Sequence, residues 1–143
     1  MNDIYDVTII GGGPSGLYSA FYAGLRELKT KIIEFQPTLG GKLHVYPEKI
    51  IWDIGGLPAT PAQKVIENLI EQGLTFKPTV CLNTKVELVT KKDNLFVIET
   101  NTGEKHYTKK VIVAVGGGII SPIKLHIEGA EKYEVSNLHY TIR

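Results

Sequence analysis

The stretch from residue 7 to residue 34 constrains this chain more than any other part of it. An apolar run at residues 7–10 leads into Gly-Gly-Gly-Pro-Ser-Gly at residues 11–16, and a segment with the apolar spacing of a helix follows. A second apolar run then ends at Glu34. A strand, a glycine turn, a helix and another strand in this order predict a βαβ unit that binds a dinucleotide pyrophosphate. The alternative is a glycine-rich loop in an ordinary α/β domain.

Each residue of the glycine turn has a chemical reason to be there. Gly11 allows the tight turn out of the strand, Gly13 lets a pyrophosphate approach the backbone, and Gly16 lets the helix pack against the strand. Pro14 falls in the first helical turn, where a missing N–H is tolerated. The free amides of the helix start, from Ser15 onward, would face the phosphates, whose negative charge the helix dipole favours.

The carboxylate of Glu34 indicates which nucleotide is bound. Glu34 lies 18 residues after Gly16, which suits an acceptor for the ribose hydroxyls of an adenosine. A carboxylate there would repel a 2′-phosphate, so the sequence predicts FAD or NAD rather than NADP. Phe35 and Gln36 follow directly, where we expect contacts to the adenine.

Composition limits the other functions that the chain could have. With 143 residues, 43% hydrophobic and 22% charged, the chain is long enough for one domain with a core. The net charge of +1 indicates neither nucleic-acid binding nor attraction to an anionic membrane. The N-terminus lacks the basic flank and apolar core of a signal peptide, and no apolar run is long enough to span a membrane. We therefore expect a cytoplasmic protein.

The reactive side chains form no catalytic or metal-binding pattern. Cys81 is the single cysteine, so no intrachain disulfide can form, and we interpret it as a core residue rather than a redox centre. The four histidines show no metal-ligand spacing, and no Ser-His-Asp arrangement or carboxylate pair stands out. We predict neither a metal site nor a catalytic residue in this chain.

The apolar patterns predict an α/β fold with a central parallel sheet and an antiparallel three-stranded meander. Helices are expected at residues 14–28 and 61–72, separated by a long, partly irregular segment at 36–61. Parallel strands are expected at Ile4–Ile10, 31–35 and 74–76. The meander is expected at residues 80–90, 95–100 and 106–108, and a return strand at 111–115.

This arrangement resembles the Rossmann-like FAD-binding domain of flavoproteins with two dinucleotide-binding domains. In that superfamily the return strand ends in an Ala/Thr-Gly pair that approaches the flavin nucleotide, and Ala114-Val115-Gly116 matches it. The segment Leu-Gly-Gly-Lys-Leu at residues 39–43 is similar to the Gly-Gly-Gln-Leu segment of thioredoxin reductases.

Two further segments narrow the resemblance. Tyr-Pro-Glu-Lys at residues 46–49 and Asp-Ile-Gly-Gly-Leu-Pro at 53–58 look more like the thiol-free relatives, the thioredoxin-reductase-like ferredoxin/flavodoxin–NADP reductases. Gly-Gly-Gly-Ile-Ile-Ser-Pro at 116–122 resembles the glycine-rich segment of the same family. The resemblance extends from residue 4 to about residue 140.

The resemblance implies further contacts to the cofactor FAD. Tyr46 would stack on the isoalloxazine, with a loop tyrosine packed on the core as the alternative. Asp53 would approach the polar edge of the flavin or cap a loop. Lys42 stands in place of the usual glutamine, and Ile120 in place of an aromatic residue. The remaining implied contacts to the nucleotide come from Gly41, Leu43, Val86 and Gly116.

The same resemblance implies that residues 1–143 are the N-terminal part of an FAD-binding domain. An NADP-binding domain and a C-terminal FAD segment would follow Arg143 in a longer protein. That protein would use NADPH to reduce FAD, pass electrons to ferredoxin or flavodoxin, and form a homodimer. Two alternatives remain. One is a thioredoxin reductase, whose Cys-x-x-Cys would lie outside this sequence, and the other is a stand-alone nucleotide-binding module without turnover.

Overall fold

The computed structural model describes residues 3–118, 126–134 and 136. Two α-helices, two short 3-10 helices and eight strands form this part of the chain. The helices are α1 (Pro14–Leu25), α2 (Ala62–Gly73), η1 (Gly41–Val45) and η2 (Ala130–Tyr133). The strands are β1 (Ile4–Ile10), β2 (Thr30–Ile33), β3 (Ile50–Ile51), β4 (Thr60–Pro61), β5 (Thr79–Cys81), β6 (Val86–Lys92), β7 (Leu95–Thr100) and β8 (Lys105–Val113).

Six strands form one sheet in the order β5-β2-β1-β8-β7-β6. The pairs β5–β2, β2–β1 and β1–β8 are parallel, and the pairs β8–β7 and β7–β6 are antiparallel. β3 and β4 pair separately as a small antiparallel ribbon. The predicted α/β fold, with a parallel sheet extended by an antiparallel meander, is confirmed.

The last strand of the meander and the return strand are one element. The prediction of separate strands at 106–108 and 111–115 is wrong, because β8 runs without a break from Lys105 to Val113. Its first half pairs with β7, and from Tyr107 onward it pairs with β1. Thr108 is fully buried at the junction, and its hydroxyl lies within hydrogen-bond distance of the carbonyl oxygens of Tyr5 and Lys110. The lysines that follow interrupt the apolar pattern but not the strand.

Residues 74–76 form a turn and not the predicted strand. The amide of Leu74 donates to the carbonyl of Ile70, and the amide of Lys77 donates to the carbonyl of Leu74. Lys77 has a φ of +51°, which lies outside the strand region. The parallel strand is β5, which pairs with β2 and takes the first residues of the segment predicted for the meander at 80–90.

Two smaller boundaries also differ from the prediction. α1 ends at Leu25 instead of residue 28, because the amides of Arg26 and Glu27 close a turn and Glu27 has a φ of +58°. β2 covers Thr30–Ile33 instead of residues 31–35. Helix ends and strand ends commonly shift by this much.

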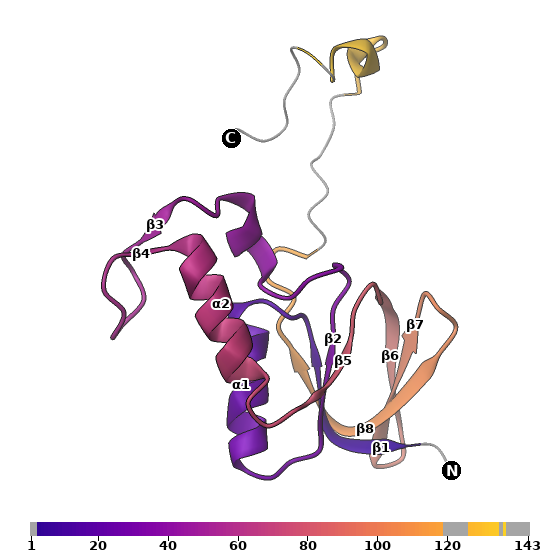
Figure 1. Cartoon of the computed structure of the whole chain (residues 1–143). Helices are drawn as coiled ribbons and strands as arrows, with labels where there is room; N and C mark the ends of the chain where they lie inside the picture. The colour runs from indigo at the N-terminus through magenta and orange to yellow at the C-terminus, as the bar shows by residue number, and fades with distance from the viewer. Residues whose placement is uncertain (1–2, 119–125, 135, 137–143) are drawn as a thin grey trace.

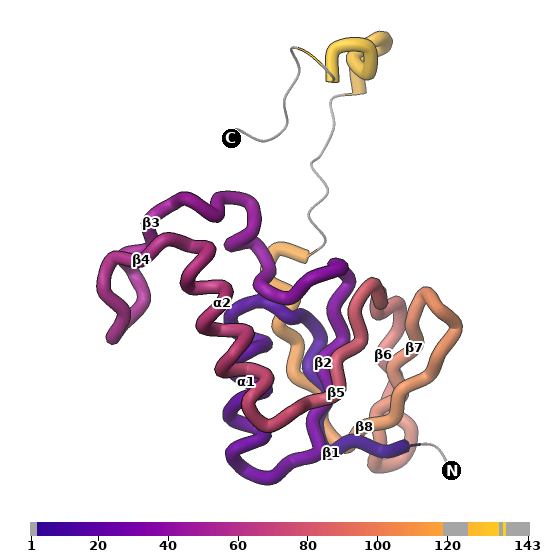
Figure 2. Tube along the Cα trace, in the orientation of Figure 1, coloured from indigo at the N-terminus to yellow at the C-terminus, as the bar shows by residue number. Residues whose placement is uncertain are grey.

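α1 packs against β1 and β2, and α2 packs against α1 (Figure 1). Between α1 and the sheet lies a cluster of buried apolar residues: Val7, Ile9, Leu17, Ala20, Ala23, Ile32 and Leu39. Gly73 at the end of α2 allows the close helix contact, since a Cβ there would lie 2.8 Å from the Leu17 side chain. The Cα trace shows the segment between β2 and α2 arching over the ends of these elements (Figure 2).

Parallel pairing decides where the functional residues meet. β1, β2 and β8 run in the same direction, so their carboxyl ends lie at one edge of the sheet. The glycine turn after β1, Glu34 after β2 and Ala114 after β8 therefore come together there, where ligands of open α/β sheets bind.

Candidate dinucleotide-binding site

Gly11 and Gly16 are glycines because the fold itself leaves no room for a side chain. Gly11 has a φ of +108°, and a Cβ there would overlap the carbonyl oxygen of Ala114 at the end of β8. A Cβ on Gly16 would overlap the carbonyl oxygen of Gly11, because α1 begins directly against the turn. These two positions shape the turn and do not by themselves indicate a ligand.

Gly13 differs from both, because the protein around it does not require a glycine. Its backbone is in an ordinary extended conformation, with φ of −77° and ψ of −173°. A Cβ would meet only Gly41 Cα at 3.7 Å, which is ordinary contact. Gly13 lines the cavity, so the space that a side chain would fill is left open toward a ligand. This fits the close approach of a pyrophosphate.

The start of α1 offers amide groups to an anion. Gly13 is the N-cap and has no side chain to cap the first turn, and Pro14 occupies the first helical position. The free N–H groups of a helix start carry partial positive charge and bind phosphate well. Ser15, which also lines the cavity, lies in this first turn.

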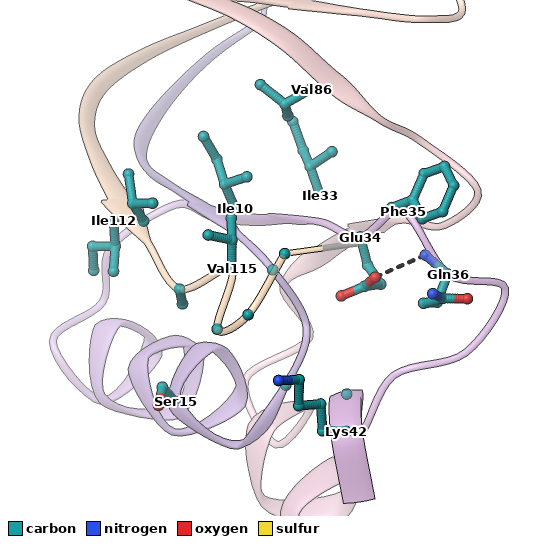
Figure 3. Close-up of a pocket in the computed structure, with 18 of the residues that line it drawn as sticks. Ile10, Ser15, Ile33, Glu34, Phe35, Gln36, Lys42, Val86, Ile112 and Val115 are labelled. Atoms are coloured by element: carbon teal, nitrogen blue, oxygen red, sulfur yellow. Dashed lines mark hydrogen bonds between the residues drawn. The ribbon is translucent and has the colours of Figure 1, made fainter. Parts of the chain in front are cut away.

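Glu34 is held firmly at the end of β2. Its two carboxylate oxygens accept hydrogen bonds from the backbone amides of Gly12 (2.6 Å) and Gln36 (2.7 Å), the latter drawn in Figure 3. Its backbone carbonyl accepts from the amide of Thr84 at 3.0 Å. Only 8% of Glu34 is exposed. Each carboxylate oxygen has a second lone pair, so Glu34 can brace the glycine turn and still accept hydrogen bonds from a ribose.

A cavity of about 740 Å³ lies at this edge of the sheet. That volume falls in the usual range for cofactor pockets. Most of the residues predicted to contact the cofactor line it: Gly11, Gly13, Pro14, Ser15, Glu34, Phe35, Gln36, Gly41, Lys42, Val86 and Gly116. The structure therefore gathers the larger part of the predicted site in one place.

Five predicted contacts do not line the cavity. Gly16 lies behind the turn, and Leu43 is on η1 without reaching the cavity. Tyr46 is 40% exposed, with the Lys49 ammonium 5.9 Å from its ring centre, and Asp53 is exposed. Ile120 lies outside the described residues. The flavin contacts expected for Tyr46 and Asp53 stay predictions.

Sequence reasoning missed several lining residues, and simple signals could have found some of them. Ser19 lies one helical turn after Ser15 and donates a hydrogen bond to its carbonyl at 2.7 Å. Ala114 and Val115, which the resemblance brings near the flavin nucleotide, also line the cavity. The lining residues that were not predicted are Ile10, Ile33, Thr84, Lys85, Ile112, Val113, Gly117 and Gly118. The position of β8 beside β1 would have pointed to its last residues.

A second cluster of polar side chains lies outside the cavity lining and contributes to the fold rather than to the cavity. Lys31 and His106 are both buried, and the Lys31 ammonium lies 3.0 Å from His106 Nδ1 and 4.0 Å from the Tyr5 ring centre. Burial lowers the pKa of Lys31, and burial followed by the Lys31 charge lowers the pKa of His106. Burial raises the pKa of the nearby Cys81 thiol. A raised thiol pKa opposes nucleophilic or redox use of Cys81.

The described residues hold no group of three His, Cys, Asp or Glu side chains that could form a metal site. None of the helices in that part of the chain has the length and apolar character needed to cross a bilayer.

The comparison with known families decides where the chain belongs. The family model described as pyridine nucleotide-disulphide oxidoreductase matches residues 5–142. The chain belongs to this family. The resemblance drawn from the glycine turn and from residues 34–58 is thus confirmed at the level of the family.

Relatives similar in sequence include ferredoxin–NADP reductases. Ferredoxin–NADP reductase 1 of Bacillus thuringiensis (strain Al Hakam) is 65% identical over 142 residues, which are 99% of this chain and 41% of the relative. Ferredoxin–NADP reductase 3 of Lysinibacillus sphaericus (strain C3-41) is 62% identical over 143 residues, which are 100% of this chain and 41% of the relative. The chain therefore spans about two fifths of the length of these curated relatives.

Solved thioredoxin reductases share the fold. The Lactococcus lactis enzyme (FR conformation) has a TM-score of 0.74 and 25% identity, covering 92% of this chain and 41% of the other. The T. acidophilum enzyme has a TM-score of 0.75 and 21% identity, covering 91% and 40%. The Rossmann-like architecture predicted from the sequence is confirmed.

Proposed function

We propose that this chain is the FAD-binding part of a flavoprotein oxidoreductase that carries electrons from NADPH through FAD to ferredoxin or flavodoxin. The observation that carries the proposal is Gly13, an unstrained glycine that lines an open cavity at the uncapped start of α1. Glu34 lines the same cavity, and its carboxylate would accept hydrogen bonds from the adenosine ribose. The names of curated relatives that match the chain support ferredoxin as the acceptor.

The residues present fit the cofactor in chemical type as well as position. The α1 amides and Gly13 would hold the diphosphate, Glu34 the ribose, and Phe35, Gln36 and Val86 the adenine. When bound, the flavin supplies the redox chemistry, and this chain supplies binding and orientation. The exposed Ile112 and Val113 at the end of β8 and the lining Gly116 would lie toward the flavin nucleotide.

We propose further that residues 1–143 belong to a longer protein, which supplies an NADP-binding domain and a C-terminal FAD segment, works as a homodimer and resides in the cytoplasm. The 41% coverage of the relatives supports the longer protein. A thioredoxin reductase is the second candidate, because solved thioredoxin reductases share the fold. A Cys-x-x-Cys in the full coding sequence would favour it, and its absence would favour the ferredoxin or flavodoxin reductase.

The test compares two valine substitutions. Gly13→Val places a branched side chain where the diphosphate would lie, so it should abolish FAD binding by the chain or by the longer protein that contains it. Gly55→Val is the matched control, because Gly55 has an ordinary φ, lies away from the cavity, and a Cβ there would have no neighbour within 4 Å. Flavin fluorescence titration measures both, with circular dichroism to verify folding. Equal FAD affinity in Gly13→Val and Gly55→Val would refute the assignment.

A further inference from the structure

Two basic side chains lie against each other in the interior and connect β2 to β8. Lys31 on β2 is 7% exposed, His106 on β8 is 8% exposed, and 3.0 Å separates Lys31 Nζ from His106 Nδ1. An ammonium group can only donate hydrogen bonds, so a charged Lys31 requires an unprotonated Nδ1 as its acceptor. The proton of the neutral imidazole is then on Nε2. The contact is therefore compatible with neutral His106 and not with its protonated form.

The groups around the pair favour a charged lysine beside a neutral histidine. The Tyr5 ring on β1 lies 4.0 Å from the Lys31 ammonium, and an aromatic face attracts a cation. Ile98, which is fully buried on β7, lies opposite His106 and offers no charge. The titratable groups that act electrostatically on Lys31 besides His106 are Asp3, Lys29, Cys81 and Glu104.

The other ring nitrogen of His106 has a carboxylate close by but no hydrogen bond. Nε2 is buried and has no hydrogen-bond partner among the described residues. The exposed Glu104 carboxylate, just before β8, lies 3.9 Å from it. Protonation of His106 would place two cations 3.0 Å apart at Lys31 and add a charge that Glu104 attracts. His106 thus has one partner for each protonation state, Lys31 when neutral and Glu104 when charged.

Hydrogen bonds connect the turn that carries Glu104 to the dinucleotide cavity. The amide of Thr100 donates to the carbonyl of Glu104 at 3.2 Å, which closes the turn between β7 and β8. In the same turn the amide of Asn101 donates to the carbonyl of Lys85 at 2.9 Å, and its side-chain oxygen accepts from the Lys85 amide at 2.8 Å. Lys85 and Val86 line the cavity. A displacement of this turn would therefore move residues of the cavity wall.

The Lys31 side of the pair leads to the same part of the cavity. β2 carries Lys31, ends at Ile33 and continues directly into Glu34. The carbonyl of Glu34 accepts from the amide of Thr84, which also lines the cavity. β2 and the meander are thus joined twice, once at the Lys31–His106 contact and once beside the cavity.

We propose that Lys31 and His106 form a pH-sensitive contact that holds the meander of β6, β7 and β8 in the position that binds the adenosine half of the dinucleotide. This inference rests on the proposed function for the identity of the ligand. Protonation of His106 breaks the contact, turns the ring toward Glu104 and lowers the affinity for FAD. Because a single proton is involved, the affinity changes by at most about tenfold per pH unit.

The first experiment needs no ligand, because NMR of the histidine rings gives the pKa of His106 in the cofactor-free longer protein. Lys31→Met removes the neighbouring cation and should raise this pKa, whereas Glu104→Gln removes the attracting carboxylate and should lower it. His126→Gln, at an exposed histidine outside the cavity, is the control and should leave it unchanged. A pKa that neither Lys31→Met nor Glu104→Gln moves would overturn the inference.

The second experiment measures the affinity for FAD against pH by fluorescence titration of the longer protein. FAD is a suitable probe, because its diphosphate is esterified at both ends and keeps its charge over this range. The affinity of the unaltered protein should fall about fivefold or more between about pH 8 and about pH 5.5, on either side of the ordinary histidine pKa. His106→Gln keeps an acceptor for Lys31 but does not titrate, so it should lose much less. His126→Gln should lose as much as the unaltered protein.

The outcomes separate this inference from the proposed function. If the unaltered protein binds no FAD at any pH, the proposed function fails, and the link between the pair and the cavity fails with it. If it binds FAD with the same affinity across this range, or if His106→Gln loses as much affinity as the unaltered protein, only the inference is overturned. If His106→Gln does not fold, the same titration of Lys31→Met decides. Its dependence on pH should be smaller, and an unchanged dependence would overturn the inference.

Discussion

Replacing Glu34 by alanine should reduce the free energy of unfolding even before any cofactor is added. The carboxylate accepts two backbone hydrogen bonds, from Gly12 at 2.6 Å and from Gln36 at 2.7 Å. The first lies in a buried contact and the second in a partly buried one. Leaving a buried donor unmet costs about 1–3 kcal/mol, so the full amount for Gly12 and a smaller amount for Gln36 give a loss of about 2–4 kcal/mol. Glu34→Gln retains one acceptor oxygen and should lose about half as much.

Urea unfolding of the cofactor-free protein measures this loss. Glu71→Ala is the matched control, because Glu71 is exposed on α2 and its side chain makes no hydrogen bond or ion pair with the described residues. It should change stability by less than about 0.5 kcal/mol. FAD affinity should fall by about 1–3 kcal/mol in Glu34→Ala as well, through the unmet ribose hydroxyls. If Glu34→Ala is as stable as Glu71→Ala, the carboxylate does not brace the turn and the reasoning is wrong.

Three further outcomes are expected. Gly16→Ala should lower the thermal stability strongly, whereas Gly13→Ala should leave it nearly unchanged, since only the Cβ at position 16 would overlap backbone. Equal losses of thermal stability in the two variants would contradict this difference between the two glycines. Burial and the Lys31 charge lower the pKa of His106 in the folded protein, so the unfolded state binds more protons. The free energy of unfolding should therefore fall as the pH drops below the ordinary histidine pKa of about 6.5. A His106→Phe variant whose stability keeps the same dependence on pH would refute this. The isolated chain with added FAD should not oxidise NADPH above a free-FAD blank in a ferricyanide assay. Hydride transfer needs a nicotinamide held about 3–3.5 Å from the flavin, and we propose that a further domain of the longer protein binds it. Clear turnover by the isolated chain would contradict that proposal.

The sequence predicted the structure best in segments whose local pattern is compatible with only one kind of secondary structure. Ile4–Ile10, the glycine turn and the start of α1 follow directly from apolar runs and glycine spacing, and the structure has them where predicted. The site residues around them were predictable because a parallel sheet brings the ends of β1, β2 and β8 to one edge. Fold class and the position of Glu34 beside the turn therefore needed no knowledge of tertiary contacts.

Where the pattern depended on distant partners, prediction failed. Leu74 and its neighbours are apolar enough for a strand, but their amides continue the end of α2, and β5 forms only where it can pair with β2. The polar residues Lys109 and Lys110 split an apolar pattern inside β8, although the strand is continuous because β1 pairs with it on both sides of them. The contact between Lys42 and Gly117 joins positions far apart in the chain, and spacing alone cannot reveal it.

The most direct test of the account is to identify the nucleotide held by the longer protein that contains this chain. The protein is purified without added cofactor, the bound nucleotide is released by heat, and chromatography gives its identity and its ratio to protein. Titration of the emptied protein with FAD and with FMN then measures the affinity for each. We predict FAD, at one molecule per chain, lost on Gly13→Val and retained on Gly55→Val. A protein that binds no flavin at saturating FAD, or that binds FMN as tightly as FAD without need of the adenosine half, would contradict the assignment of the cavity.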